Sequence, residues 1–525
     1  MSRLWPFLSN HARLSALAFG FLSATGFQPL GLWPLALAAM GAFAGLIAES
    51  RDARQAAWLG WLFGWAHFTF GNNWIATAFT HQAEMPAVLG WAAVPLLSLY
   101  LAFFPAVAAL GARAMAGQSR PYVLALALAG CWVLSEFLRA RVFTGYAWNP
   151  FAMVLLGPFD RPGLAALSPW MGTYALSGLA VFFAAALAAL LRYRRYVAAV
   201  ATAALIAAGM YLPAPAARQG TVRFTLVQPD LPQDQLSNPL YWEANFVRLA
   251  QLSPARAPAP GASFDRLVLW PESGLVDYLR PGYPQRYYDR TTSFGDPKLA
   301  RERIGRLIGT GSVLLTGAVD LEIEDDRAAG AYNAVTALDS SGGILGGYRK
   351  AHLVPYGEYL PMRPLLEPIG LSRLVAGSID FIPGPGPQTL DLGPLGKAGI
   401  QVCYEIVFSG EVVDRHNRPD YIFNPSNDGW FGNFGPPQHL AQARMRAIEE
   451  GLPVLRATTT GISAVIDPHG VVRRHFAQMR GGRIDGTIPQ AEPPTLFARL
   501  GDWLPLAWAL LANAAALIAS RRTAR

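Results

Sequence analysis

The chain has 525 residues, of which 52% are hydrophobic and 15% are charged, and its formal net charge is +8. This composition is too apolar for an ordinary soluble protein and excludes that class. The apolar residues are concentrated at the two ends of the chain.

Apolar stretches near the N-terminus are long enough to cross a bilayer, which takes roughly 20 residues of helix for a hydrocarbon core of about 30 Å. We predict seven membrane helices there and an eighth at the C-terminus, and therefore a polytopic helical bundle. No small-residue cleavage site leads into a polar domain, so we expect the first helix to be retained. The predicted spans are 12–28, 31–48, 56–79, 87–112, 122–138, 168–191, 195–212 and 502–519.

Arginines flank alternate connections between these spans, which the positive-inside rule assigns to the cytoplasm. Both termini are then cytoplasmic and residues 213–500 lie outside. The net charge is largely explained by these arginines, so it does not indicate a nucleic-acid partner. Arg139 and Arg141, beside Glu136, break the pattern: such charges face a polar head group, pair with each other, or mark a misplaced span boundary. The arginines that follow the rule are Arg3, Arg13, Arg51, Arg54, Arg113, Arg120, Arg192, Arg194, Arg195, Arg521, Arg522 and Arg525.

The segment 213–500 has short apolar runs separated by helical patterns or Gly/Pro loops. This alternation predicts an α/β or α+β domain with helix-covered sheets. The domains are then 1–212, 213–500 and 501–525. The predicted strands are 222–227, 267–270, 313–319, 399–402, 421–423, 454–457 and 463–466, and the predicted helices include 299–307 and 438–450.

Three chemically complementary residues follow or flank apolar runs in this domain: Glu272, Lys350 and Cys403. A thiolate attacks a carbonyl, a carboxylate moves the proton, and an ammonium stabilises the oxyanion. Taken singly, a cysteine is more often a small buried hydrophobe, and a glutamate or lysine is more often a solvated charge.

Four motifs in a fixed order make these residues more informative together. They are Trp270-Pro271-Glu272, the run from Lys350 to Tyr359, Cys403-Tyr404-Glu405, and Asn427-Asp428-Gly429-Trp430-Phe431-Gly432. Their order resembles the carbon-nitrogen hydrolase (nitrilase) superfamily. Combined with eight spans, the whole chain resembles the apolipoprotein N-acyltransferase family. The resemblance implies a nitrilase-like αββα sandwich. It also implies that this domain lies on the periplasmic side of a bacterial inner membrane.

The resemblance also assigns roles to residues. It implies that Glu272 is the general base, Lys350 the oxyanion-stabilising residue and Cys403 the nucleophile. Plain aromatic packing is the alternative for Tyr404 and Trp430, and a solvated charge is the alternative for Glu358. Threonines stand at 458–460 where family members are expected to have asparagines. The supporting residues are Glu358, Tyr404, Glu405, Asn427 and Trp430, with Trp242 as a weaker match to a loop tryptophan.

The implied reaction moves an acyl chain from a membrane glycerophospholipid to the α-amine of a diacylglyceryl-modified lipoprotein cysteine, through a thioester on Cys403. Trp430, Phe431 and Phe434 are expected either to exclude water or simply to pack in the core. Two alternatives are a membrane-tethered amidase that uses water and a non-catalytic binding or transport protein. The complete triad and the nearly uncharged spans argue against the second.

No cofactor or metal is expected, because the histidines lack ligand spacing. Cys131 falls within the fifth span, remote from Cys403, so no intrachain disulfide is expected.

Overall fold

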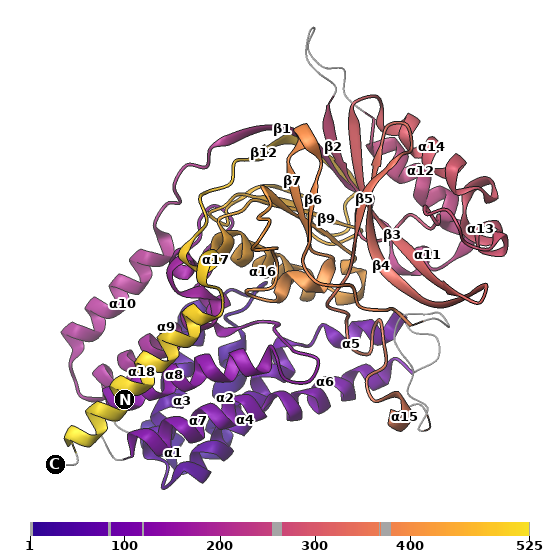
Figure 1. Ribbon diagram of the computed structural model, residues 1–525. Coiled ribbons are helices and arrows are strands. Elements are labelled where there is room, and N and C mark those ends of the chain that lie inside the picture. Colours follow the sequence, from indigo (N-terminus) through magenta and orange to yellow (C-terminus); the bar gives the residue numbers. More distant parts are fainter. Residues whose placement is uncertain are drawn as a thin grey trace.

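A computed structural model describes residues 4–81, 86–117, 120–254, 265–366, 368 and 380–523. Figure 1 shows a bundle of helices beneath a domain built around two β-sheets. Arg3 and Arg525, which contributed to the predicted topology, lie outside the described residues.

Every apolar stretch predicted to span the membrane is helical. The stretch 56–79 divides into two helices, and 87–112 also contains two that follow one another directly. The helices are α1 (Leu4–Asn10), α2 (Ala12–Ala24), α3 (Trp33–Glu49), α4 (Ala53–Gly71), α5 (Ile75–Ala78), α6 (Val88–Leu101), α7 (Phe103–Ala116), α8 (Pro121–Arg139), α9 (Ser168–Arg192), α10 (Tyr196–Tyr211) and α18 (Trp503–Thr523).

Four helical stretches in the described part of the chain are long and apolar enough to cross a membrane: Val88–Ala116, Pro121–Arg139, Leu164–Arg192 and Trp503–Arg522. Ala12–Ala24, Trp33–Glu49 and Tyr196–Tyr211 are apolar but shorter. A membrane-type helical bundle is therefore confirmed, whereas a count of eight full spans is not reached by length and composition.

Small residues bring the bundle helices close together. A side-chain carbon at Gly60 of α4 would lie 2.6 Å from the Pro105 carbonyl oxygen of α7, and one at Gly41 of α3 would lie 2.5 Å from the Ala184 oxygen of α9. Close backbone approach replaces hydrophobic burial as the source of packing energy within lipid. These glycines thus fix the spacing of the bundle.

The segment 213–500, which we call the outer domain, contains two six-stranded sheets in its described residues. The first has the order β12-β1-β2-β3-β4-β5, and the second has the order β11-β10-β9-β8-β7-β6. The strands β1, β2 and β3 are parallel neighbours, as are β7, β8 and β9. Strand bounds are β1 (Gln219–Gln228), β2 (Arg266–Leu269), β3 (Ser312–Glu324), β4 (Arg327–Asp339), β5 (Ile344–Arg349), β6 (Thr389–Asp391), β7 (Lys397–Ile400), β8 (Tyr421–Ser426), β9 (Val454–Thr458), β10 (Ala464–Ile466), β11 (Val472–His475) and β12 (Gly482–Pro489).

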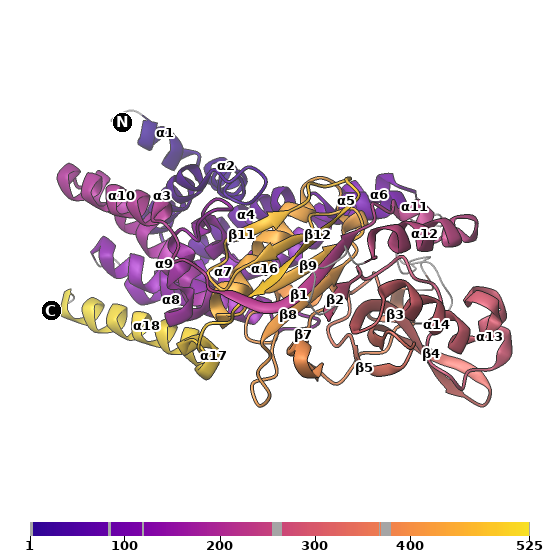
Figure 2. The same ribbon diagram turned by 90° about the horizontal axis from the view of Figure 1, so that it is seen from above.

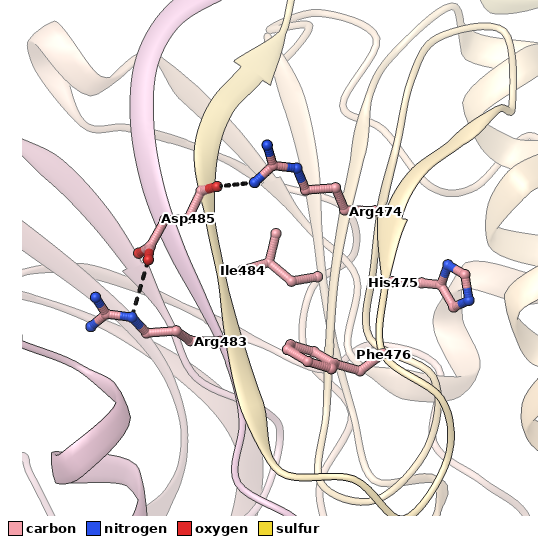
Figure 3. A pocket seen from close by; sticks show the side chains of 6 residues that line it. All are labelled: Arg474, His475, Phe476, Arg483, Ile484 and Asp485. Carbon is pink, nitrogen blue, oxygen red and sulfur yellow. Dashed lines mark hydrogen bonds and ion pairs between the residues drawn. The ribbon is translucent and has the colours of Figure 1, made fainter. Parts of the chain in front are cut away.

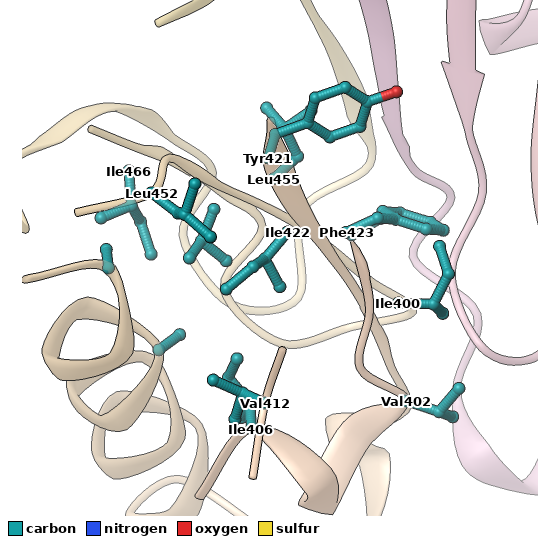
Figure 4. Packing of buried hydrophobic residues seen from close by; sticks show 14 of the residues in the cluster. Ile400, Val402, Ile406, Val412, Tyr421, Ile422, Phe423, Leu452, Leu455 and Ile466 are labelled. Carbon is teal, nitrogen blue, oxygen red and sulfur yellow. The ribbon is translucent and has the colours of Figure 1, made fainter. Parts of the chain in front are cut away.

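Helices cover the outer faces of the two sheets. Helices α12 (Trp242–Leu252) and α14 (Pro297–Ile308) pack on the first sheet, and Figure 2 shows them on one flank of the molecule. Helix α16 (Gly435–Glu450) packs on the second sheet. Figure 4 shows Ile422 turned toward the helix side and its neighbour Phe423 turned the other way, the alternation expected of a strand buried on both faces. The predicted αββα arrangement is confirmed.

Helix α16 also joins the outer domain to the bundle. Nearly all of its side chains are buried. The Arg444 guanidinium donates to the carbonyl oxygens of Gly157 and Pro158, in the segment between α8 and α9, at 2.8 and 2.7 Å. The outer domain is therefore seated directly on the apolar helices.

Candidate active site

Three strand ends deliver the three candidate catalytic residues. Strand β2 ends at Leu269 and Glu272 follows it after the fully buried Trp270. Lys350 directly follows β5. Cys403 begins the short 3-10 helix Cys403–Val407, just after β7. Two of these strands belong to the first sheet and one to the second, so the site lies where the two sheets face each other.

Lys350 lies between two carboxylates. Its Nζ is 3.0 Å from Glu358 Oε2 and 3.6 Å from Glu272 Oε1, and its side chain is 1% exposed. Burial alone lowers the pKa of Lys350, but Glu358 and then Glu272 raise it well above its ordinary value. The ammonium is therefore charged and can stabilise an oxyanion. A solvated loop charge does not describe Glu358, which is buried.

Cys403 is a buried thiol on a strained turn. Its φ is +51°, a region that side chains other than glycine rarely adopt, and it is 5% exposed. Burial raises the pKa of the thiol well above its ordinary value, the Glu272 carboxylate raises it further, and Lys350 opposes this. The resting thiol is thus protonated, so attack needs a base that removes the proton as the bond forms.

Asn333 on β4 bridges the two carboxylates, and sequence reasoning missed it. Its Nδ2 donates to Glu272 Oε1 and to Glu358 Oε1, each at 2.7 Å, and its carbonyl oxygen accepts the Lys350 N–H at 2.8 Å. The Asn333 side chain therefore orients both carboxylates, and its backbone carbonyl holds the backbone of Lys350. The available signal was a polar residue within the apolar run of a strand that we did not predict.

Glu405 ties the Lys350 loop to the Cys403 turn. Its Oε1 accepts from the Tyr348 hydroxyl at 2.7 Å and from the N–H groups of Ala351 and His352 at 2.7 and 3.1 Å. Its Oε2 accepts the Val402 N–H at 2.8 Å. Burial raises the pKa of Glu405 to about 7. This carboxylate therefore fixes the loop after Lys350 relative to the turn at Cys403.

Asn427 lies against the general-base candidate. Its N–H donates to Glu272 Oε2 at 2.7 Å, and its side chain donates to Gln233 Oε1 at 2.8 Å. Its Oδ1 accepts the Thr459 hydroxyl at 2.8 Å. The unexpected threonine thus completes the hydrogen bonding of this residue.

Tyr404 and Trp430 make aromatic contacts with the bundle side of the molecule. Tyr404 stacks on Trp148 at 6.4 Å between ring centroids, and Trp430 meets His81 edge-on at 5.8 Å. The ring centroids of Phe431 and Trp74 are 4.8 Å apart, and Phe434 packs against the hydrophobic cluster that contains both residues. Aromatic packing is therefore what the structure shows for Tyr404 and Trp430, and their supporting roles stay predictions.

Trp242 begins α12 and is held by its own loop, where its indole N–H donates to the Leu236 carbonyl oxygen at 3.2 Å. Among the described residues, no hydrogen bond or ring contact joins it to Glu272, Lys350 or Cys403. Its role stays a prediction.

The two arginines that break the charge rule contact protein groups. Arg141 forms ion pairs with Glu411 and with Asp502 at the start of α18. Arg139 is buried, donates to the Trp148 carbonyl oxygen at 2.8 Å and lies over the Phe68 ring. Arg141 therefore pairs with acidic residues far along the chain and links the bundle to the outer domain.

Two cavities in the outer domain differ in their relation to the candidate catalytic residues. One of about 500 Å³ is lined by residues that include His352, Gln401 and Glu405, so it borders the site. The other, of about 490 Å³, lies between β11 and β12 (Figure 3), where Arg483 pairs with the Asp485 carboxylate at 3.0 Å and Arg474 donates to the Asp485 carbonyl oxygen at 2.7 Å. It contains none of the candidate catalytic residues.

Comparison with known families covers both parts of the chain. Residues 19–186 match the model of the apolipoprotein N-acyltransferase N-terminal domain, and residues 235–490 match that of carbon-nitrogen hydrolases. The apolipoprotein N-acyltransferase of Rhodopseudomonas palustris is 36% identical over 515 residues, covering 94% of this chain and 92% of the relative. The chain belongs to the apolipoprotein N-acyltransferase family. The family member of Bradyrhizobium diazoefficiens is 35% identical and covers 98% of this chain and 95% of its own.

Two solved structures are similar to about half of this chain. An amidase from Nesterenkonia sp. AN1 is 19% identical, covering 53% of this chain and 94% of its own, with a TM-score of 0.33. A carbon-nitrogen hydrolase superfamily protein from Xanthomonas campestris is 17% identical, covering 51% of this chain and 90% of its own, with a TM-score of 0.32.

Proposed function

We propose that this family member transfers an acyl chain from a membrane glycerophospholipid to the N-terminal α-amine of a diacylglyceryl-cysteine lipoprotein. The observation that carries the proposal is the buried Cys403 thiol, which is electrostatically coupled to Glu272 and Lys350 in a domain seated on apolar helices. Both substrates are anchored in lipid, so a catalytic domain fixed to a membrane bundle can meet both.

The first half-reaction forms a thioester. Glu272 accepts the Cys403 proton as Sγ attacks the ester carbonyl, and Lys350 stabilises the negative oxygen of the tetrahedral intermediate. The carbon–oxygen bond then breaks, Glu272 returns the proton to the departing alkoxide, and a lysophospholipid leaves. Glu272 can serve both steps because Asn333 and Asn427 hold its two oxygens at 2.7 Å.

The second half-reaction consumes the thioester. The lipoprotein α-amine attacks the same carbonyl, Glu272 accepts the amine proton, and the carbon–sulfur bond breaks to form an amide. The proton returns to Sγ and restores the thiol. The aromatic contacts of Trp74, Trp148 and Phe431 around the site favour exclusion of water, which would otherwise compete with the amine.

The proposed setting is a bacterial inner membrane, with the outer domain in the periplasm and both termini in the cytoplasm. The arginines on alternate connections support this orientation.

The test is stepwise acylation of the purified protein. Incubation with a phospholipid alone is expected to add one acyl mass to the peptide that contains Cys403. A diacylglyceryl lipopeptide with a free α-amine is then expected to remove it and gain the amide. Cys131→Ala is the matched thiol control and should react normally. Full N-acylation by Cys403→Ala would refute the proposal, and discharge by water with no amide product would favour the amidase alternative.

A further inference from the structure

A buried histidine contacts the backbone of the proposed nucleophile. His439 lies on α16 and is 0% exposed, and its Nε2 is 3.0 Å from the Cys403 carbonyl oxygen. A carbonyl oxygen can only accept a hydrogen bond, so Nε2 carries the hydrogen whatever the charge of the ring. His439 therefore donates to the strained residue itself.

The other edge of the imidazole is fixed by a buried ion pair. Nδ1 lies 3.0 Å from Asp428 Oδ1 and 3.0 Å from the Arg456 guanidinium. Arg456 in turn binds the two Asp428 oxygens at 2.8 and 2.7 Å, and both side chains are fully buried. The ring cannot turn without breaking these contacts, so the direction of the Nε2–H is set before substrate arrives.

Cys403 needs such a restraint because its φ of +51° is unfavourable for a residue with a side chain. Conformations of this kind persist only where the surroundings impose them. Glu405 restrains the turn on one side by accepting the Val402 N–H at 2.8 Å. His439 restrains the other side, together with a longer contact of 3.5 Å from Asn424 to the same carbonyl oxygen.

We infer that His439 is a positioning residue for acyl transfer, whose Nε2–H holds the Cys403 backbone so that the thiol faces Glu272 and Lys350. It acts through the peptide group and takes no proton from substrate, because its Nε2 hydrogen is already committed to the carbonyl oxygen. The inference rests on the proposed role of Cys403 as nucleophile. It differs from a purely structural role in requiring a donor at one particular point of the side chain.

Two amide replacements separate these roles. The Gln amide in His439→Gln reaches the position of Nε2 and keeps a donor for the Cys403 carbonyl, whereas the shorter Asn amide in His439→Asn reaches only the position of Nδ1. The rate constant of Cys403 acylation at saturating phospholipid should fall about 10- to 100-fold in the Asn variant, as expected for loss of a buried hydrogen bond. It should stay within about threefold of the unaltered rate in the Gln variant. The half-saturating phospholipid concentration should change little in either, because the lost interaction acts on the reacting group.

Gln442→Leu is the matched control, since Gln442 is a fully buried polar residue of the same helix whose side-chain atoms have no hydrogen-bond partner among the described residues. It should acylate at the normal rate. His439→Leu also lacks the donor, so its rate constant of Cys403 acylation should fall as in the Asn variant. If one of these two variants misfolds, the other can still be compared with the Gln variant. Equal rates in the Asn, Leu and Gln variants, whether all normal or all slow, would overturn the inference. Cys403→Ala is measured alongside. If it still transfers acyl groups, the proposed function is wrong. If it is inactive, the rates of the His439 variants test the role of His439 separately from the proposed function.

Discussion

The indole N–H of Trp148 donates to the side-chain oxygen of Gln438 at 2.8 Å, and so joins the loop after α8 to helix α16. Asn149 donates to the same oxygen at 2.9 Å, and the Gln438 amide donates to the Gly71 carbonyl oxygen of α4 at 3.2 Å. The next residue along α16 is His439, which contacts Cys403. Two adjacent residues therefore connect the apolar bundle to the proposed nucleophile.

Trp148→Ala should destabilise the protein by about 3 to 5 kcal/mol, because it empties the site of a fully buried indole and leaves Gln438 with one donor fewer. The midpoint of thermal unfolding in detergent should fall accordingly. Trp91→Ala is the control, since that indole is 72% exposed, and it should unfold as the unaltered protein does. Equal unfolding midpoints for the two variants would show that the contact of Trp148 with α16 does not stabilise the protein.

Asn333→Leu should slow Cys403 acylation about 10- to 100-fold, because it removes the hydrogen bond to Glu272 Oε1, and a hydrogen bond to a charged group contributes about 1.5 to 3 kcal/mol. Glu272 then loses the partner that fixes Oε1. The rate is measured by the mass of the Cys403 peptide over time. Asn417→Leu removes an amide that contacts Lys397 instead, and should leave the rate unchanged. A normal rate in Asn333→Leu would mean that Asn427 alone suffices to orient Glu272.

Glu272→Gln should change thiol reactivity and acyl transfer in opposite directions. Burial is the main cause of the raised pKa of Cys403 and the Glu272 carboxylate adds to it, so the neutral amide lowers that pKa and increases the thiolate fraction. Alkylation of Cys403 by iodoacetamide at pH 8 should therefore become faster. Acylation should become about 10²- to 10⁴-fold slower, because the base is lost.

This comparison is made in a Cys131→Ala background, so that alkylation reports on Cys403 alone. Lys350 provides the contrasting control: Lys350→Met removes the charge that lowers the pKa of Cys403, so alkylation and acylation should both become slower. Faster acylation in Glu272→Gln would rule out its role as the base.

Glu450→Gln should stabilise the protein at alkaline pH. Burial, followed by the neighbouring Glu449 carboxylate, raises the pKa of Glu450 from 4.5 to about 7, and within the part of the chain that the structure describes neither of its side-chain oxygens has a hydrogen-bond partner. The unfolded chain ionises first as the pH rises, so stability is lost between about pH 4.5 and 7. The full difference corresponds to about 3 kcal/mol at most.

The amide cannot ionise, so the unfolding midpoint of Glu450→Gln should exceed that of the unaltered protein at pH 8 and match it at pH 4.5. Glu324→Gln, at an exposed position at the end of β3, should show no such pH-dependent gain. A constant difference between pH 4.5 and 8 would mean that Glu450 ionises normally in the folded protein.

Sequence patterns located much of the outer domain. The runs near 222–227, 267–270, 313–319, 399–402, 421–423, 454–457 and 463–466 all lie in or beside strands, because continuous apolar runs mark strands buried on both faces. The strands β4, β5, β6, β11 and β12 escaped prediction. Their glycines, polar residues and exposed positions weaken the apolar pattern, and strand pairing rather than local hydrophobicity holds them.

The sequence by itself determined where Glu272 and Cys403 stand relative to their strands, since a polar residue just after a buried run is a local feature of the chain. It placed Lys350 only in a polar loop, because the strand before it, β5, was not predicted. Only the tertiary structure decided what surrounds them. Asn333 on β4 reaches Glu272, which follows β2, although β3 lies between these strands, and Arg141 meets Asp502 although they are 361 residues apart. Such contacts depend on sheet order and helix packing, which the local pattern of hydrophobic and polar residues does not encode. The φ of +51° at Cys403 is likewise not evident in the sequence, because residues with a side chain usually avoid this region and the His439 contact with the Cys403 carbonyl oxygen comes from a separate helix.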